Sequence, residues 1–212
     1  MKLQLAIDLL DIEPALELMQ KVHPWVDIIE IGTPLIKSKG MLPVELFHNL
    51  YSDKLICADM KTMDAGAIEA ELACQAGADL ITVLGVANNS TLYKANDVAK
   101  KYNKKIMVDL IMVPDKKQRI SELADWEIDY FIVHSGYDDQ SSGANPIEDL
   151  ALLSYQTSRP IAVAGGINLE NIDRVIKHTP SIIIVGSGIA AHKQPERVAQ
   201  KIYNQLNSSR AG

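Results

Sequence analysis

The sequence predicts an α/β fold, a compact (β/α)8 barrel in which residues 1–212 form a single domain. Three observations support this prediction: eight short apolar runs rich in Val and Ile, amphipathic stretches between them, and a regular spacing of the runs. The runs recur at roughly twenty to thirty residues, the length of one strand, one crossover helix and two short loops. An open doubly wound sheet, the main alternative, needs only about six strands and leaves two units unexplained.

Each predicted strand is nearly continuous in apolar residues, as expected for parallel strands that are buried on both faces. In chain order the strands are predicted at 3–7, 26–31, 54–58, 79–84, 105–110, 129–133, 159–164 and 181–185. Between them, apolar residues recur every three or four positions, which is the pattern of helices that cover a sheet. The clearest helices are predicted at 13–22, 65–76, 90–102, 169–177 and 195–206.

Composition excludes several classes of protein. With 21 basic and 27 acidic residues the formal net charge is −6, so the chain lacks the basic surface that a nucleic-acid partner requires. No apolar run of about eighteen residues is free of charge, so no membrane insertion is expected. Cys57 and Cys74 lie in apolar surroundings without paired spacing, which suits buried thiols. Since no secretory leader is expected either, the predicted location is the cytoplasm.

Polar residues stand where the predicted strands end. In such a barrel the reactive groups sit at the carboxyl ends of the strands. Burying an unpaired carboxylate costs several kcal/mol, so packing alone does not explain acidic residues at these positions. The sequence therefore predicts a site at this rim, formed by Asp8, Glu30, Asp59, Lys61, Asp64, Asp109 and His134.

The end of the third strand carries the most informative group. Side chains alternate along an extended backbone, so Asp59 and Lys61 are predicted to point the same way and to meet one ligand. A structural ion pair is the alternative. Asp64 follows three residues later, and either a chemical role or a cap on the next helix fits its position.

Glu30 and Asp59 are predicted at the same level of neighbouring strands, where their carboxylates converge on one Mg²⁺ ion. The alternative is that Glu30 pairs with Lys61 without a metal. His134 follows an apolar run and is the best candidate for a general acid or base, although a lone histidine there is often structural.

Glycines follow the last two predicted strands and let backbone N–H groups approach an anion. Gly165, Gly166, Gly186 and Ser187 are therefore predicted to bind the phosphate of a phosphate ester. The stretch 186–191 also matches the glycine pattern of a dinucleotide-binding turn, but too little chain follows it to build such a unit.

Several motifs together resemble the 3-hexulose-6-phosphate synthase family of the orotidine monophosphate decarboxylase superfamily. They are LAID at 5–8, IEIGTP at 29–34, ADMKTMDAG at 58–66, HSGYD at 134–138, AGGI at 164–167 and VGSGI at 185–189. The sibling 3-keto-L-gulonate 6-phosphate decarboxylases carry arginines where this chain has Tyr137 and Ser187, which favours the synthase family. Met112 departs from the synthase pattern, in which an asparagine is usual.

The resemblance implies a Mg²⁺-dependent, reversible aldol reaction between formaldehyde and D-ribulose 5-phosphate that gives D-arabino-hex-3-ulose 6-phosphate through an enediolate. It assigns the metal to Glu30 and Asp59, and the proton transfer at C1 of the sugar to His134. Lys61 is expected to stabilise the developing enediolate, and Asp8 and Asp64 to orient Lys61 and the sugar hydroxyls.

The resemblance also implies a homodimer in which Asp64 reaches the partner's site. Two other functions on the same barrel stay open. A sugar-phosphate isomerase or epimerase begins with the same proton abstraction but needs no formaldehyde. A non-catalytic sugar-phosphate sensor would keep the glycine loops without needing Asp59, Lys61 and His134 together.

Overall fold

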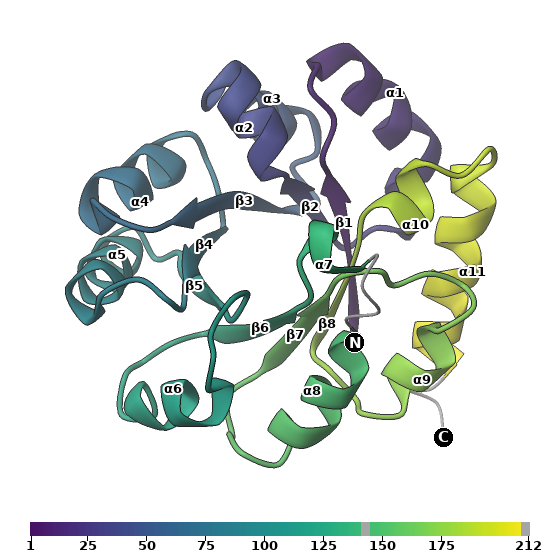
Figure 1. Ribbon diagram of the computed structural model, residues 1–212. Helices are drawn as coiled ribbons and strands as arrows, with labels where there is room; N and C mark the ends of the chain where they lie inside the picture. The colour runs from purple at the N-terminus through teal and green to yellow at the C-terminus, as the bar shows by residue number, and fades with distance from the viewer. Residues whose placement is uncertain (141–144, 209–212) are drawn as a thin grey trace.

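Eight parallel strands close into a barrel in the computed structural model of the protein, which describes residues 1–140 and 145–208. Each strand pairs with the next along the chain, and β1 (Lys2–Ile7) pairs with β8 (Ile182–Val185) to complete the ring. Figure 1 looks into the barrel and shows most of the helices as an outer layer around the strands. The predicted (β/α)8 fold is thereby confirmed.

The other strands lie where the apolar runs are, with small shifts at their ends. They are β2 (Ile28–Ile31), β3 (Leu55–Thr62), β4 (Leu80–Leu84), β5 (Lys105–Asp109), β6 (Tyr130–His134) and β7 (Ile161–Ala164). The largest shift is in β3, predicted to end at residue 58 but continuing through its charged residues to Thr62. Hydrophobicity alone does not reveal this extension, because the added residues include Asp59 and Lys61.

Helices fill the connections between strands, including several that the sequence pattern did not single out. They are α1 (Ile12–Val22), the short 3-10 helix η1 (His23–Trp25), α2 (Thr33–Lys39), α3 (Leu42–Leu50), α4 (Gly66–Gln75), α5 (Asn89–Lys101), α6 (Lys116–Glu122), α7 (Tyr137–Gln140), α8 (Pro146–Leu153), α9 (Ile172–Ile176), α10 (Ser187–Ala190) and α11 (Pro195–Ser208). The amphipathic α11 buries Val198, Ala199, Ile202 and Leu206 and packs on α1 and β1.

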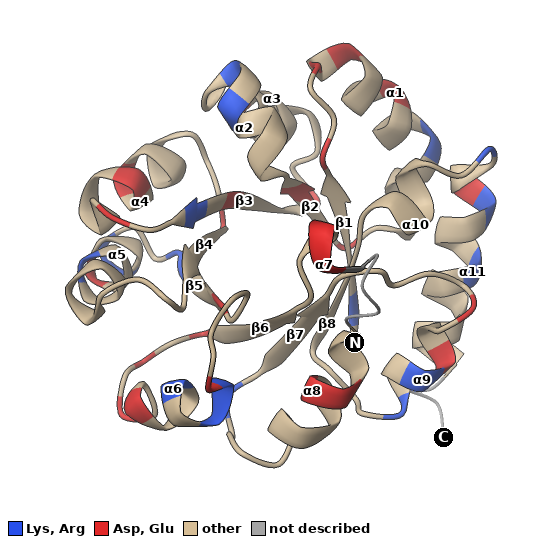
Figure 2. Cartoon of the chain, in the orientation of Figure 1, with Lys and Arg blue, Asp and Glu red and all other residues tan. Residues whose placement is uncertain are grey.

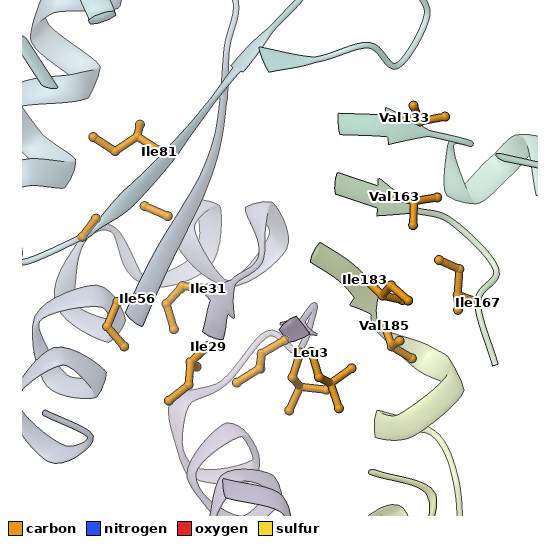
Figure 3. Close-up of a cluster of buried hydrophobic side chains, with 14 of the residues drawn as sticks. Leu3, Ile29, Ile31, Ile56, Ile81, Val133, Val163, Ile167, Ile183 and Val185 are labelled. Carbon is orange, nitrogen blue, oxygen red and sulfur yellow. The ribbon is translucent and has the colours of Figure 1, made fainter. Parts of the chain in front are cut away.

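The strands are mostly apolar because both of their faces are buried. Outward-facing side chains such as Ile29, Ile31 and Val163 form a core with the covering helices (Figure 3). Inward-facing ones, such as Ile28 and Met107, fill the barrel itself. Burying each such large side chain stabilises the fold by roughly 1.5–3 kcal/mol, which fixes the rim on which the site is built.

Cys57 and Cys74 are both free and buried, as the sequence predicts. Across residues 1–140 and 145–208, no helix is both long and apolar enough to cross a membrane.

Candidate active site

Inside the barrel, the side chains change from apolar to polar toward the carboxyl ends of the strands. The apolar layer contains Ile28, Cys57, Leu80, Met107 and Ile132. Because alternate residues of a strand face the same side, the next inward positions on the same strands are Glu30, Asp59, Thr82, Asp109 and His134. Figure 2 shows the charged segments of β2 and β3 at this end of the barrel. Four of the predicted strand-end residues, Glu30, Asp59, Asp109 and His134, thus point into the barrel above an apolar plug.

Asp59 is the most tightly held member of this group. Its side chain is buried, and both oxygens accept hydrogen bonds: Oδ1 from Thr82 Oγ1 at 2.7 Å, and Oδ2 from Thr33 Oγ1 at 2.8 Å and from the Lys61 ammonium. Burial opposes the negative charge, but the charge and hydrogen bond of Lys61, with the bonds from Thr82 and Thr33, keep the pKa of Asp59 below its ordinary value. The carboxyl group is therefore an anion at neutral pH.

Lys61 lies between two carboxylates. Its Nζ pairs with Asp59 and lies 3.9 Å from Oδ2 of Asp109. Burial disfavours the ammonium charge, but Asp59 and Asp109 outweigh it and raise the pKa of Lys61. The side chains of Asp59 and Lys61 form an ion pair, as the alternation predicts, and the Lys61 ammonium is a fixed positive charge at the rim.

His134 is oriented by Asp109. Nδ1 of His134 lies 2.8 Å from Oδ2 of Asp109, a buried residue at the end of β5. Oδ1 of Asp109 accepts a hydrogen bond from the Ile111 backbone N–H at 2.9 Å, which fixes the carboxylate. Because an ionised carboxylate only accepts, Nδ1 carries the proton and Nε2 is left to exchange a proton with a ligand.

Glu30 is buried and is held by a neutral side chain. Gln4 Nε2 donates a hydrogen bond to its Oε2 at 2.6 Å, and no described residue forms an ion pair with it. The predicted alternative, a Glu30–Lys61 ion pair, is therefore wrong, because Lys61 turns to Asp59 and Asp109 instead. Burial first, and the charge of Asp59 second, raise the pKa of Glu30 to about 8.

Glu30 and Asp59 do not lie at the same level of their neighbouring strands, although the sequence predicts that they do. The register pairs Glu30 with Cys57, so Asp59 lies one inward-facing position further along β3 and nearer the rim. The two carboxylates remain close enough for the charge of Asp59 to raise the pKa of Glu30. They lie in adjacent layers on neighbouring strands rather than side by side.

The donor set of Glu30 and Asp59 fits Mg²⁺. The two buried carboxylates repel each other, and Lys61 is bonded to only one of them, so a second positive charge between them would be stabilising. Mg²⁺ is usually held by one or two carboxylates, with water and ligand oxygens completing its shell. Within the described residues, no three His, Cys, Asp or Glu side chains cluster closely enough to hold a metal, so a site saturated by protein ligands is not formed there.

Asp8 lies at the end of β1, open to the barrel mouth but crowded by the protein on its sides. A Cβ atom on Gly32 would come within 2.2 Å of its Oδ1 and within 2.7 Å of the backbone oxygen of Ile7, and because the backbone oxygen cannot move aside, glycine is required beside Asp8. Partial burial, and then the charge of Asp59, raise the pKa of Asp8. Asp8 therefore stands close to the charged group of β3.

Asp64 is exposed in the turn between β3 and α4. Its Oδ1 accepts a hydrogen bond from the backbone N–H of Ala65 at 2.7 Å. Ala65, in a left-handed conformation with φ 55°, occupies the N-cap position of α4. The predicted helix-cap role of Asp64 is therefore wrong, and its side chain is accessible to another group.

The glycines after β7 and β8 allow close packing of the loops at the rim. Gly165 has φ 104°, and a Cβ atom there would lie 2.3 Å from the backbone oxygen of Ser135. α10 begins at Ser187, just after Gly186, so the first N–H groups of this turn have no acceptor within the helix. The dinucleotide alternative is not supported, because α10 has four residues and is followed by α11, the last helix of the barrel, with no further strand.

Three hydrogen-bonding residues of the site were not identified from the sequence. Thr33 and Thr82 hold Asp59, and Gln4 holds Glu30. Thr82 and Gln4 sit inside apolar runs, where a polar residue is hard to tell from an ordinary strand residue. Their inward parity, two residues from Leu80 and Ala6, is the only signal that could have found them.

The family model described as orotidine 5'-phosphate decarboxylase / HUMPS matches residues 1–202. A 3-hexulose-6-phosphate synthase of Staphylococcus aureus is 43% identical over 202 residues, covering 95% of this chain and 96% of its own. The crystal structure of 3-hexulose-6-phosphate synthase from Salmonella typhimurium aligns with a TM-score of 0.97 at 38% identity, covering 99% of this chain and 100% of that one. A 3-keto-L-gulonate-6-phosphate decarboxylase from Vibrio cholerae aligns with a TM-score of 0.84 at 27% identity, covering 98% and 97%. The predicted resemblance is confirmed.

Proposed function

The chain belongs to the orotidine 5'-phosphate decarboxylase / HUMPS family, and we propose that it is a 3-hexulose-6-phosphate synthase. It joins formaldehyde to D-ribulose 5-phosphate and gives D-arabino-hex-3-ulose 6-phosphate. One observation carries the proposal at the level of chemistry: Asp109 links the imidazole of His134 to the ammonium of Lys61. A proton acceptor and a fixed positive charge are what proton removal beside a carbonyl requires.

The substrate phosphate binds at the backbone of Gly165, Gly166, Gly186 and Ser187. Binding energy from this remote group positions C1 and C2 of the sugar over the polar residues of the rim. Mg²⁺ held by Glu30 and Asp59 supplies, when bound, additional positive charge for the sugar's oxygens.

His134 removes a proton from C1 through Nε2, while Asp109 keeps Nδ1 protonated and stabilises the imidazolium. The electron pair of the broken C–H bond moves into a C1–C2 double bond, and the ammonium of Lys61 stabilises the resulting enediolate oxygen. C1 then attacks the carbon of formaldehyde. The new C–C bond restores the carbonyl at the former C2, and the formaldehyde oxygen takes up the proton, returning His134 to its starting state.

Two residues favour the synthase over the sibling decarboxylase. Tyr137 begins α7 with 78% of its surface exposed, and Ser187 begins α10. In the decarboxylase family, arginines are expected at these two positions. Neither Tyr137 nor Ser187 adds a cation that would stabilise a carboxylate on the substrate.

We further propose a homodimer, with Asp64 reaching the partner's site. Large apolar side chains are exposed on and beside α4 and α5, which pack together: Met63, Ile68, Leu72 and Tyr93 are each about half exposed or more. A second copy that covers this face (Figure 1) would bury them around Asp64. We propose the cytoplasm as the compartment, because its reducing conditions suit the two free thiols.

Formaldehyde consumption in the presence of ribulose 5-phosphate tests the function directly, with and without Mg²⁺. We expect metal-dependent loss of formaldehyde that far exceeds CO₂ release from 3-keto-L-gulonate 6-phosphate. Dominant decarboxylation would identify the sibling activity. Turnover of ribulose 5-phosphate without formaldehyde would identify an isomerase or epimerase, and no turnover of either substrate would favour a sensor.

A further inference from the structure

β3 contains an irregular segment at the point where its charged residues begin. The register against β4 runs Cys57 to Leu80 and Ala58 to Ile81, and then resumes at Thr62 opposite Val83. Four steps along β3 therefore match two along β4, and residues 59–61 bulge opposite the single residue Thr82. Lys61, inside this bulge, has φ 45°, a left-handed conformation that is uncommon outside glycine.

Thr82 connects the two ends of the bulge through one hydroxyl group. Its Oγ1 accepts a hydrogen bond from the Lys61 backbone N–H at 2.9 Å and donates one to Oδ1 of Asp59 at 2.7 Å. Thr82 is 1% exposed, so water does not readily replace either bond. The bulge takes the Lys61 N–H out of the regular ladder, and a buried N–H without an acceptor is strongly disfavoured.

The two hydrogen bonds also fix the direction in which the Thr82 hydroxyl donates its proton. Because its lone pair receives the Lys61 N–H, its own proton is directed to Asp59, whose other oxygen is bound by Lys61 Nζ and Thr33. The backbone conformation of Lys61 and the rotamer of Asp59 are thus tied to one atom. Groups that hydrogen-bond to a metal-ligating carboxylate commonly affect metal affinity by about 10–100-fold. We expect the hydrogen bond from Thr82 to have an effect of this size.

We propose that Thr82 is a positioning residue, whose hydroxyl holds the β3 bulge so that the Asp59 carboxylate and the Lys61 ammonium keep their mutual geometry. The inference rests on the proposed function, because it assigns Thr82 a role in that site. The inference adds a requirement that is not visible in the segment containing Asp59 and Lys61: the next strand, β4, must carry a hydroxyl group opposite the bulge.

Two substitutions separate the hydroxyl from the shape of the side chain. Thr82→Val keeps the volume and removes both hydrogen bonds, whereas Thr82→Ser keeps the hydroxyl and removes a methyl group. Thr62→Val is the matched control, because Thr62 is buried on the neighbouring strand β3 and its Oγ1 has no hydrogen-bond partner among the described residues.

We expect Thr82→Val to lower kcat by about 10–100-fold and to weaken binding of Mn²⁺, as a probe for Mg²⁺, to the substrate-free protein by about tenfold. Hydrogen exchange at the Lys61 amide should accelerate, because its acceptor is gone. Thr82→Ser should stay within about threefold of the wild type in all three measurements, and Thr62→Val should change none of them.

The inference is overturned if Thr82→Val folds and matches Thr82→Ser in metal binding, kcat and amide exchange. It is also overturned if Thr82→Ser is as impaired as Thr82→Val, since the methyl group would then matter rather than the hydroxyl. Metal binding and amide exchange need no turnover, so a wild type without synthase activity would refute the proposed function and leave these two readings decisive. Should Thr82→Val not fold, the same comparison is made between Thr82→Ala and Thr82→Ser, which differ only in the hydroxyl group.

Discussion

His134 Nδ1 and Asp109 Oδ2 lie 2.8 Å apart at the ends of two adjacent strands, β6 and β5. The same carboxylate oxygen lies 3.9 Å from Nζ of Lys61. One buried anion therefore serves two groups: it sets the tautomer of the proton acceptor and balances the cation beside it. When His134 takes a proton, the new positive charge forms against a carboxylate that is already in place.

Asp109→Asn tests this relationship. The amide keeps the size of the side chain, but it can donate to Nδ1 and so favour the wrong tautomer of His134. We expect kcat to fall by about a hundredfold or more with a small change in KM, because proton transfer is lost and substrate binding is not. Steady-state kinetics with ribulose 5-phosphate and formaldehyde provide the measurement.

Asp125→Asn is the matched control for that substitution. Asp125 is exposed in the turn after α6, so the same chemical change should leave kcat near the wild-type value. Equal activity of Asp109→Asn and wild type would show that His134 does not depend on Asp109 for its tautomer.

The fold could be predicted almost completely because its signal is repeated. Each of eight strands must bury both faces, so each leaves a continuous apolar run, and one misplaced end does not change the count. β3 shows the limit of this signal. Its end was predicted four residues early, because the bulge at 59–61 is stabilised by Thr82 from another strand and not by any local pattern.

The site could be predicted as a set of residues but not as a set of contacts. Strand-end position identified Glu30, Asp59, Lys61 and His134, since acidic and basic residues rarely follow buried strands without a reason. The partners depend on register and side-chain direction. Glu30 is bonded to Gln4 rather than to Lys61, and no spacing in one sequence specifies that choice.

Protons should compete with Mg²⁺ at Glu30. The pKa of Glu30 is raised to about 8, whereas that of Asp59 is lowered, so only Glu30 changes its charge between neutral and mildly basic pH. A metal ligand must be deprotonated, so the Kd for Mg²⁺ should fall by up to about tenfold per pH unit as the pH rises toward about 8, and then level off.

Titration calorimetry on the substrate-free protein measures this dependence. Glu30→Gln should bind Mg²⁺ weakly and show little dependence on pH over the same range. A Kd for the wild type that is constant from about pH 6 to about pH 8 would contradict a raised pKa of Glu30.

The same group should make the metal-free protein less stable as the pH rises. The folded-state pKa of Glu30 is about 8 and its ordinary value is 4.5, so between these values the unfolded chain loses the proton while the folded protein keeps it. The stability that protonated Glu30 contributes is fully present below about pH 4.5. It declines as the pH rises from there to about 8, by about 1.4 kcal/mol per unit of pKa difference and several kcal/mol in all. The pKa of Asp59 is lowered in the folded protein, so its contribution to stability has the opposite pH dependence. It is lost as the pH falls below the ordinary pKa of 3.8.

Urea denaturation without metal, at several pH values, gives the free energy of unfolding. Glu30→Gln should remove most of the decline and be more stable than the wild type near pH 8; the raised pKa of Asp8 leaves a smaller decline of the same sign. Added Mg²⁺ should restore the wild type and leave the variant nearly unchanged. A wild-type stability that increases from pH 5 to 8 without metal would be incompatible with this account.

Asp64 should act in the site of the partner subunit. Lys61→Ala and Asp64→Ala are each expected to be inactive as homodimers. In a mixed dimer, one site then lacks both side chains, and the other combines an intact Lys61 with an intact Asp64 from its partner. Random exchange of equal amounts makes half of the dimers mixed, so about a quarter of the wild-type activity should return. If Asp64 serves its own barrel, every site of the mixed dimer lacks one residue and no activity returns.

Native mass spectrometry establishes that subunit exchange has occurred. A mixture of Lys61→Ala with His134→Ala is the control, because both residues serve the barrel of their own subunit. Each site of that mixed dimer lacks one of the two residues, so this pair should stay inactive even though the subunits exchange.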